Sequence, residues 1–249
     1  MEGKIKGLLR MTLAGQVFPI LSGLASSAQI RSIFKNAQKY LKDPVCGGFR
    51  LNTDFTEEQL NLGRAFSFIY GDKENGAFFS HMNVMFAYAL YSRGFVKEGR
   101  RVLSSIYKMA ENTPRSKIYP GIPEYFNSEG RGMYSYLTGS ASWFVLALLT
   151  QVFGIRGEYG DLLIEPKLTS EEFYASRIVS ITCPFAHKTV EVKFINPAKK
   201  DYGSYSITKI TFNAKILSGN IKAKRYLIPR GKFLALADKK HNIIELTLD

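Results

Sequence analysis

The residues best suited to chemistry lie in the run RGMYSYLTGSASWF, which occupies positions 131–144. It begins with Arg131, places Thr138 and Gly139 near its centre, and contains Trp143, the one tryptophan of the chain. The apolar run VLALLTQVFGI follows, so the small residues are expected to open a helix. The first backbone N–H groups of a helix have no partner inside it and attract anions. This run is therefore a candidate anion site.

A second group of candidate residues lies in the segment KENGAFFSH at positions 73–81. His81 directly precedes a helical pattern, where a histidine can contact a ligand or serve as an ordinary hydrogen-bonded residue of the helix start. Lys73 and Glu74 stand upstream, and Gly76 follows them, which allows the backbone to bend closely around a ligand. These neighbours favour a binding role for His81.

Carboxylates and aromatic residues are concentrated in two loops, 71–83 and 117–139. Glycosidic-bond chemistry requires one or two carboxyl groups in a cleft, and the loops offer Glu74, Glu124 and Glu129. Taken singly, each of these is better explained as a solvated loop charge. The aromatic side chains suit the stacking of sugar rings, but packing in a core explains many of them equally well.

Helical patterns must position these loops in the first part of the chain. Four helices are predicted from apolar residues at helical spacing, over 27–43, 83–94, 97–112 and 140–154. Ser27 is the expected N-cap of the first helix, and Gly94 is the expected C-cap of the second. A connection of a few residues predicts an antiparallel hairpin of the second and third helices. The fourth is apolar on nearly all sides, which predicts a buried helix.

The pattern changes to strands after about residue 160. Six segments alternate apolar and polar residues at period two, over 161–168, 177–185, 188–197, 204–217, 224–236 and 241–249. Turn signals separate them, and short strands at this spacing favour a β-sandwich. The sequence therefore predicts two domains, 1–158 and 159–249.

The formal net charge of +13 is large for a chain of 249 residues and directs attention to acidic partners. The positive charges are spread over both halves of the chain instead of forming a patch or stripe. Nucleic-acid binders concentrate their basic residues, so this distribution argues against nucleic acid as partner. No stretch is long enough to span a membrane, and no membrane partner is expected.

Cysteine usage and the N-terminal segment bear on the compartment. Cys46 and Cys183 lack the spacing of a metal or redox motif, so two free buried thiols in a reducing compartment are expected, with no metal and no cofactor. The first residues imitate a secretory signal, but Arg10, Gln16 and Pro19 interrupt the apolar run. A cytoplasmic location is therefore expected.

Several motifs resemble one enzyme family. They are GGFRLNTDF at 47–55, KENGAFFSH at 73–81, YSYLTGSASW at 134–143 and VFGIRGEYGDLLIEPKL at 152–168. On these motifs the chain resembles the C-terminal part of the inverting disaccharide phosphorylases of glycoside hydrolase family 94, a group that includes cellobiose, chitobiose and laminaribiose phosphorylases. The resemblance implies the C-terminal portion of an (α/α)6 barrel, with the phosphate and acceptor side of the active site, followed by a small antiparallel β-sandwich.

The resemblance also implies a reaction, the phosphorolysis of β-linked gluco-disaccharides or oligosaccharides to an α-sugar 1-phosphate. Inorganic phosphate is then a co-substrate, and no metal or other cofactor is implied. His81, Thr138 and Gly139 match phosphate ligands, while Lys73 and Glu74 match positions that line the acceptor-sugar subsite. Arg131 is a candidate from its position alone, because it precedes Thr138 closely enough to reach phosphate or acceptor.

One part of the family pattern is missing. The general acid of the family is an Asp in a tryptophan-rich DWND-type segment, and Asp43, Asp54 and Asp72 lie in other contexts. No catalytic residue is therefore assigned, and the acid is expected upstream of this chain. The sequence thus predicts an incomplete phosphorylase that works with an upstream half-chain or as a homodimer. A non-catalytic carbohydrate- or phosphate-binding remnant, or a split subunit, is the alternative.

Overall fold

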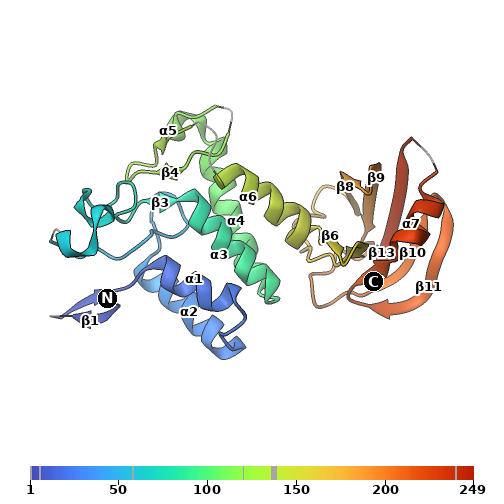
Figure 1. Ribbon diagram of the computed structural model, residues 1–249, viewed down its shortest axis with the longest axis horizontal. Coiled ribbons are helices and arrows are strands. Elements are labelled where there is room, and N and C mark those ends of the chain that lie inside the picture. Colours follow the sequence, from blue (N-terminus) through green and yellow to red (C-terminus); the bar gives the residue numbers. More distant parts are fainter. Residues whose placement is uncertain (1, 6, 58, 120, 136–138, 239) are drawn as a thin grey trace. The chain divides into compact units, whose positions relative to one another are not determined.

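The structure is a computed structural model, and it forms two compact units, Met1–Ala147 and Leu148–Asp249 (Figure 1). It describes residues 2–5, 7–57, 59–119, 121–135, 139–238 and 240–249. The predicted domains 1–158 and 159–249 stay a prediction, because a division into compact units does not by itself test where the domains end. Together the units make a mixed α and β protein.

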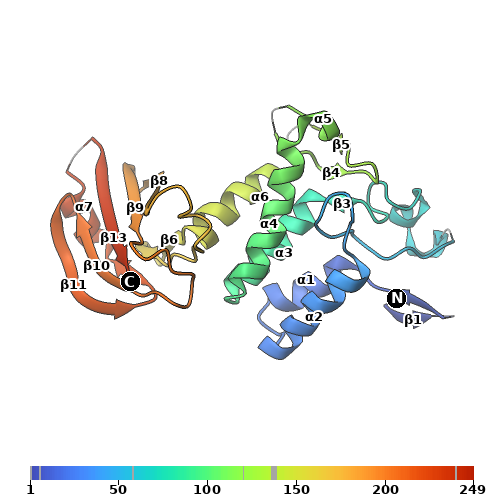
Figure 2. The same ribbon diagram turned by 180° about the vertical axis from the view of Figure 1, so that it is seen from behind.

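The first unit is mainly helical. Its helices are α1 Leu13–Leu21, α2 Ser27–Tyr40, α3 Ser80–Ser92, α4 Val96–Glu111, α5 Thr113–Ser116 and α6 Gly139–Ala147. In both Figure 1 and Figure 2, α3 runs between α1 and α6, and it packs against both of them and against α4. The helices predicted over 27–43, 83–94 and 97–112 are confirmed as α2, α3 and α4. Among the described residues, no helix combines the length and the apolar character needed to cross a bilayer.

The helix ends follow local chemistry. Helix α2 starts with a capping box, in which Ser26 Oγ accepts from the Gln29 N–H at 3.3 Å and Gln29 Oε1 accepts from the Ser26 N–H at 2.8 Å. The prediction of Ser27 as N-cap is therefore wrong by one residue. Helix α3 ends at Ser92 with Arg93 as its C-cap, so the prediction of Gly94 as C-cap is wrong by one residue. Gly94 follows the cap with a φ of 78°, and its N–H donates to the carbonyl of Tyr91 at 3.0 Å.

The fourth predicted helix differs most from expectation. α-Helical hydrogen bonding ends at Ala147, and Leu148–Val152 forms a π-helical turn instead of two further α-helical turns. The helix is not buried, since Val145 is 62% exposed and Leu146 is 40% exposed. An apolar sequence predicts that a helix is covered in the working protein. It does not show whether the covering element belongs to the same chain.

A small sheet joins the two loops that the sequence singled out. Its strands β3 Phe78–Phe79, β4 Tyr125–Phe126 and β5 Gly132–Met133 are antiparallel, in the order β3-β4-β5. The N-terminal segment forms a separate hairpin, β1 Gly3–Ile5 with β2 Leu8–Arg10. Because β3 directly precedes α3, the β3–β4 pairing brings the second loop beside the first loop and the start of that helix.

The second unit consists mostly of strands. Its elements are β6 Ile155–Glu158, β7 Asp161–Ile164, β8 Ile178–Phe185, β9 Lys188–Ile195, β10 Ile207–Phe212, β11 Lys215–Ala223, β12 Tyr226–Ile228, α7 Arg230–Leu236 and β13 Asn242–Leu248. They form a five-stranded sheet, β11-β10-β13-β9-β8, and a three-stranded sheet, β12-β7-β6. Strands β13 and β9 are parallel, so the expectation of a fully antiparallel arrangement is wrong for this pair. Alternating hydrophobicity carries no information on strand direction.

The segment predicted as a strand over 224–236 is divided between β12 and α7. Pro229 is the N-cap of α7 and ends the strand, because proline cannot donate to a sheet ladder. Phe233 of α7 is fully buried, with its ring centre 4.9 Å from that of Phe185 and 5.4 Å from that of Phe212. The helix thus contributes to the core of this unit.

Candidate functional site

The start of α3 and the start of α6 bring two of the predicted phosphate ligands together. His81 is the second residue of α3, and Gly139 is the first residue of α6. A Cβ atom at Gly139 would lie 3.1 Å from Cε1 and 3.2 Å from Nδ1 of His81. A glycine is therefore the residue that lets the α6 backbone approach the imidazole without displacing it.

The imidazole of His81 also lies beside aromatic rings. Its ring centre lies 5.4 Å from that of Trp143, which in turn contacts the ring of Tyr88 at 5.8 Å. Burial lowers the pKa of His81 below its ordinary value, so the imidazole is neutral at pH 7. Its Nε2 atom is buried and has no hydrogen-bond partner among the described residues. His81 is therefore a neutral imidazole, and its Nε2 can donate or accept a hydrogen bond depending on the tautomer.

Ser80 is a polar residue that the sequence analysis overlooked. Its side chain is fully buried, and Oγ has no hydrogen-bond partner within the described part of the chain. Its backbone N–H donates to the carbonyl of Glu124 at 2.9 Å, which ties the start of α3 to the second loop. The sequence feature that could have identified Ser80 is its position directly before His81 in a run of aromatic residues.

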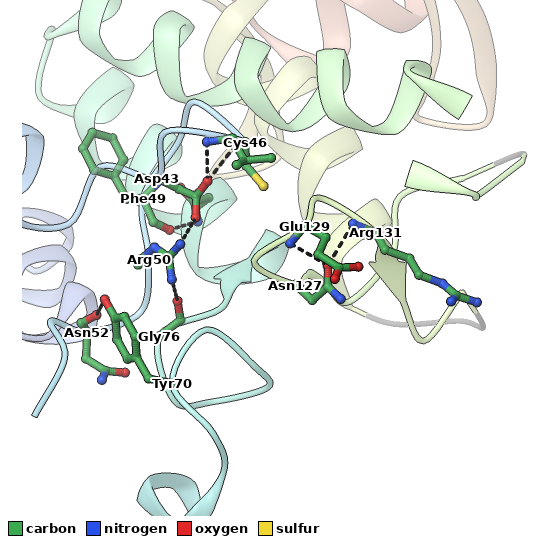
Figure 3. Close-up of polar contacts among 12 residues, drawn as sticks. Asp43, Cys46, Phe49, Arg50, Asn52, Tyr70, Gly76, Asn127, Glu129 and Arg131 are labelled. Carbon is green, nitrogen blue, oxygen red and sulfur yellow. Dashed lines mark hydrogen bonds and ion pairs between the residues drawn. The ribbon is translucent and has the colours of Figure 1, made fainter. Parts of the chain in front are cut away.

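Arg131, another predicted ligand, is not part of this contact. Thr138 lies outside the described residues. Arg131 is exposed, and its backbone N–H donates to Oδ1 of Asn127 at 2.9 Å, while its side chain extends away from that turn (Figure 3). Together with Arg115 and Lys117 it lines a cavity of about 590 Å³ on α5 and the following loop. The structure thus does not group Arg131 with Lys73 and Glu74, which line another cavity.

That second cavity has a volume of about 230 Å³ and is lined by charged residues from both loops. It is lined by Arg64, Lys73, Glu74, Phe79, Glu124, Tyr125 and Tyr134. Two basic, two acidic and three aromatic side chains can recognise a polar ring, because they offer hydrogen bonds at the edges of a sugar and flat surfaces for its faces. Arg64 was missed by the sequence analysis, since it lies in a segment without helical or strand periodicity.

Lys73 has a specific place at this cavity. Its backbone φ is 43°, an uncommon value for a residue with a side chain. Its Nζ atom lies 4.8 Å from the ring centre of Phe68 and 5.4 Å from that of Tyr134. The hydrogen bond with Tyr134 raises the pKa of Lys73, so the ammonium group stays charged. Lys73 is thus a cationic donor held over two aromatic faces.

The aspartates considered as possible acids are engaged in local structure. Asp43 forms an ion pair with Arg50 at 2.9 Å, and Oδ1 of Asp54 accepts from the Thr56 N–H at 2.7 Å. Asp72 accepts a hydrogen bond from the Tyr125 hydroxyl at 3.0 Å. Burial, reinforced by the Asp72 carboxylate, raises the pKa of Tyr125, so this hydroxyl keeps its proton.

Comparison with known proteins identifies the family. Residues 7–154 match the family described as "Glycosyl hydrolase 94 superfamily, catalytic domain". The match covers more than half of the chain and includes His81, Gly139, Lys73 and Glu74. The chain therefore belongs to this family, as the sequence resemblance indicated.

Individual relatives are phosphorylases. The chain is 27% identical to cellobionic acid phosphorylase of Neurospora crassa over 175 residues, which cover 65% of this chain and 22% of that protein. It is 24% identical to N,N'-diacetylchitobiose phosphorylase of Vibrio proteolyticus over 224 residues, 85% of this chain and 26% of that protein. The matches thus span about a quarter of the length of these relatives.

A solved structure described as a sialidase shares the fold. Its TM-score is 0.56 at 12% sequence identity, and the match covers 88% of this chain and 20% of that one. At this identity the likeness concerns the fold alone.

Proposed function

We propose that this chain provides the phosphate- and acceptor-binding part of an inverting phosphorylase for β-linked disaccharides. In the proposed reaction, inorganic phosphate attacks the anomeric carbon from the face opposite the glycosidic oxygen and yields an α-sugar 1-phosphate. A carboxylic acid protonates the leaving oxygen. Family membership and the phosphorylase names of the relatives support the reaction type.

The contact between His81 and Gly139 is the observation that carries the proposal. A neutral imidazole donates one N–H to a phosphate oxygen, and backbone N–H groups at the start of α6 donate to others. The negative charge of bound phosphate then favours protonation of His81, which strengthens the hydrogen bond. Thr138 supplies a hydroxyl to the same anion in this proposal.

The cavity beside the small sheet is the proposed acceptor subsite. Lys73 donates to sugar hydroxyls, and the carboxylate of Glu74 accepts from them. The ring of Phe79 offers a flat apolar surface on which a sugar face stacks. The substrate class is a β-linked gluco-disaccharide, with cellobionic acid and diacetylchitobiose, named in the relatives, as the alternatives to be compared.

In this proposal the general acid and the donor-sugar subsite come from an upstream half-chain, because a second copy would lack the same segment. The helices of the first unit are then part of an (α/α)6 barrel, and the strands of the second unit are a β-sandwich. Two observations support this arrangement: the match to about a quarter of each relative, and the exposed apolar side chains Val145 and Leu146 on α6.

The reverse reaction tests the proposal directly. The chain is purified together with an upstream half-chain that carries the general acid. The assembly is incubated with α-glucose 1-phosphate and glucose or gluconate, or with the α-1-phosphate of N-acetylglucosamine and N-acetylglucosamine, and phosphate release is followed. Release with one acceptor supports a complete site in the assembly and names the substrate. His81→Asn should abolish the release, and Arg131→Gln, outside the proposed site, should leave it intact.

A non-catalytic binding protein is the second candidate. The engagement of Asp43, Asp54 and Asp72 in local structure favours it. If the folded assembly releases no phosphate with any acceptor while the chain binds phosphate in a His81-dependent manner, the binding role is supported. Absence of both release and phosphate binding would refute both candidates.

A further inference from the structure

We infer that Arg50 is a positioning residue, whose guanidinium fixes the turn 71–76 that carries Lys73 and Glu74 to the acceptor cavity. The inference rests on the proposed function, because it takes this turn as part of a sugar-binding site. Arg50 belongs to the motif GGFRLNTDF, which contributed to the family resemblance without an assigned role.

One side of the Arg50 guanidinium is held by a buried anchor. Asp43 is 1% exposed, and its Oδ1 accepts from the N–H groups of Val45 at 2.8 Å and Cys46 at 2.7 Å. Its other oxygen forms the ion pair with Nη2 of Arg50 at 2.9 Å (Figure 3). A carboxylate with three such donors has little freedom, so it fixes the orientation of the guanidinium plane.

The other side of Arg50 faces the turn. Its Nη1 donates to the carbonyl of Gly76 at 3.4 Å, and its guanidinium carbon lies 5.2 Å from the ring centre of Tyr70 (Figure 3). The Tyr70 ring occupies the space beside Gly76, where an added Cβ would lie 2.3 Å from it. The Tyr70 hydroxyl donates to the carbonyl of Asn52 at 3.2 Å. Arg50 and Tyr70 therefore hold the turn 71–76 in place together.

The turn needs such support because its backbone is strained. Lys73 has a φ of 43° and Gly76 a φ of 78°, and such a conformation at a non-glycine residue persists only where the surroundings fix it. Asn75 closes the turn from inside, since its amide nitrogen donates to the carbonyl of Phe68 at 2.7 Å and its side-chain oxygen accepts from Asn52 at 3.0 Å. These contacts thus fix the backbone positions from which the Lys73 and Glu74 side chains extend.

Substitution of Arg50 by lysine separates positioning from folding. Arg50→Lys keeps a cation opposite Asp43 but loses the planar fork and the stacking on Tyr70. We expect the affinity of the full chain for acceptor sugar to fall about tenfold while its affinity for inorganic phosphate changes by less than about twofold. Saturation-transfer NMR with glucose, gluconate and N-acetylglucosamine measures the first, and phosphorus NMR measures the second. A purely structural role would change both affinities together or neither.

Two further variants keep the test decisive. Arg93→Lys is the matched control, because the Arg93 guanidinium likewise holds a backbone segment, donating to the carbonyls of Ile20 in α1 at 3.3 Å and of Ala25 after α1 at 2.8 Å. It should leave acceptor affinity unchanged. Tyr70→Leu leaves the Asp43–Arg50 ion pair intact and should show the same selective loss as Arg50→Lys; it decides the matter if Arg50→Lys fails to fold.

The outcomes distinguish the inference from the function on which it rests. If the unaltered chain binds none of the three sugars, the proposed function and the inference are both overturned. If the unaltered chain binds a sugar and the folded Arg50 and Tyr70 variants bind it equally well, only the inference is overturned.

Discussion

Gly139 is the position at which one added carbon atom would reach the proposed phosphate site. A Cβ there would stand 3.1 Å from the His81 ring, closer than most real contacts, so Gly139→Ala should displace the imidazole or the start of α6. We expect phosphate affinity to fall about tenfold with little change in the unfolding midpoint. Phosphorus NMR and thermal unfolding provide the two measurements.

Gly157→Ala is the matched control for this substitution, since an added Cβ at Gly157 would meet nothing within 4 Å. It should bind phosphate as the unaltered chain does. If Gly139→Ala also binds phosphate normally, the start of α6 is not part of the anion site.

His81 should also give the chain a pH-dependent stability. Because burial lowers its pKa below the ordinary 6.5, the unfolded chain binds a proton that the folded chain does not, in the interval between the lowered value and 6.5. Stability at this residue should therefore decrease as the pH falls through that interval. The unfolding midpoint of the unaltered chain should fall more steeply below pH 6.5 than that of His81→Gln. Equal slopes would show that His81 does not titrate differently on folding.

Among the elements, α2 offers the clearest energetic test. Ser26 accepts the Gln29 N–H at the helix start, so Ser26→Ala should cost about 1 kcal/mol in the free energy of unfolding. Ser27→Ala is the control, because Ser27 is already inside the helix and exposed, and it should change stability by less than about 0.5 kcal/mol. Urea denaturation measures both. The reverse ranking would place the N-cap where the sequence analysis put it.

The same elements show how far sequence alone reaches. α2, α3 and α4 were predictable because each carries its own apolar periodicity and an end signal such as Gly94. The parallel pairing of β13 with β9 was not, because alternation does not encode direction. For the site, the pairing of His81 with Gly139 came from motif resemblance. The support of the 71–76 turn by Arg50 was beyond reach, because it depends on contacts between segments far apart in the chain.

At the scale of the whole molecule, we expect another protein surface to cover the exposed apolar face of α6. Val145 is 62% exposed and Leu146 is 40% exposed. We expect the chain to self-associate at high concentration through this face, and Val145→Lys to weaken the association about tenfold by placing a charge in the contact. Sedimentation velocity over a range of concentrations measures it.

Ile216→Lys serves as the comparison, since Ile216 is a similarly exposed residue, at 68%, on β11 of the second unit. It should leave the association unchanged. Equal effects of the two lysines would indicate general charge repulsion and not a specific role of α6.

The contact between Trp143 and His81 has one more consequence. Because the chain contains no other tryptophan, all of its indole emission comes from a ring 5.4 Å from the imidazole. Any change in charge or hydration at His81 alters the surroundings of that one fluorophore. The protein therefore contains its own optical reporter, and occupancy of the proposed phosphate site can be followed in unlabelled protein at low concentration and in real time.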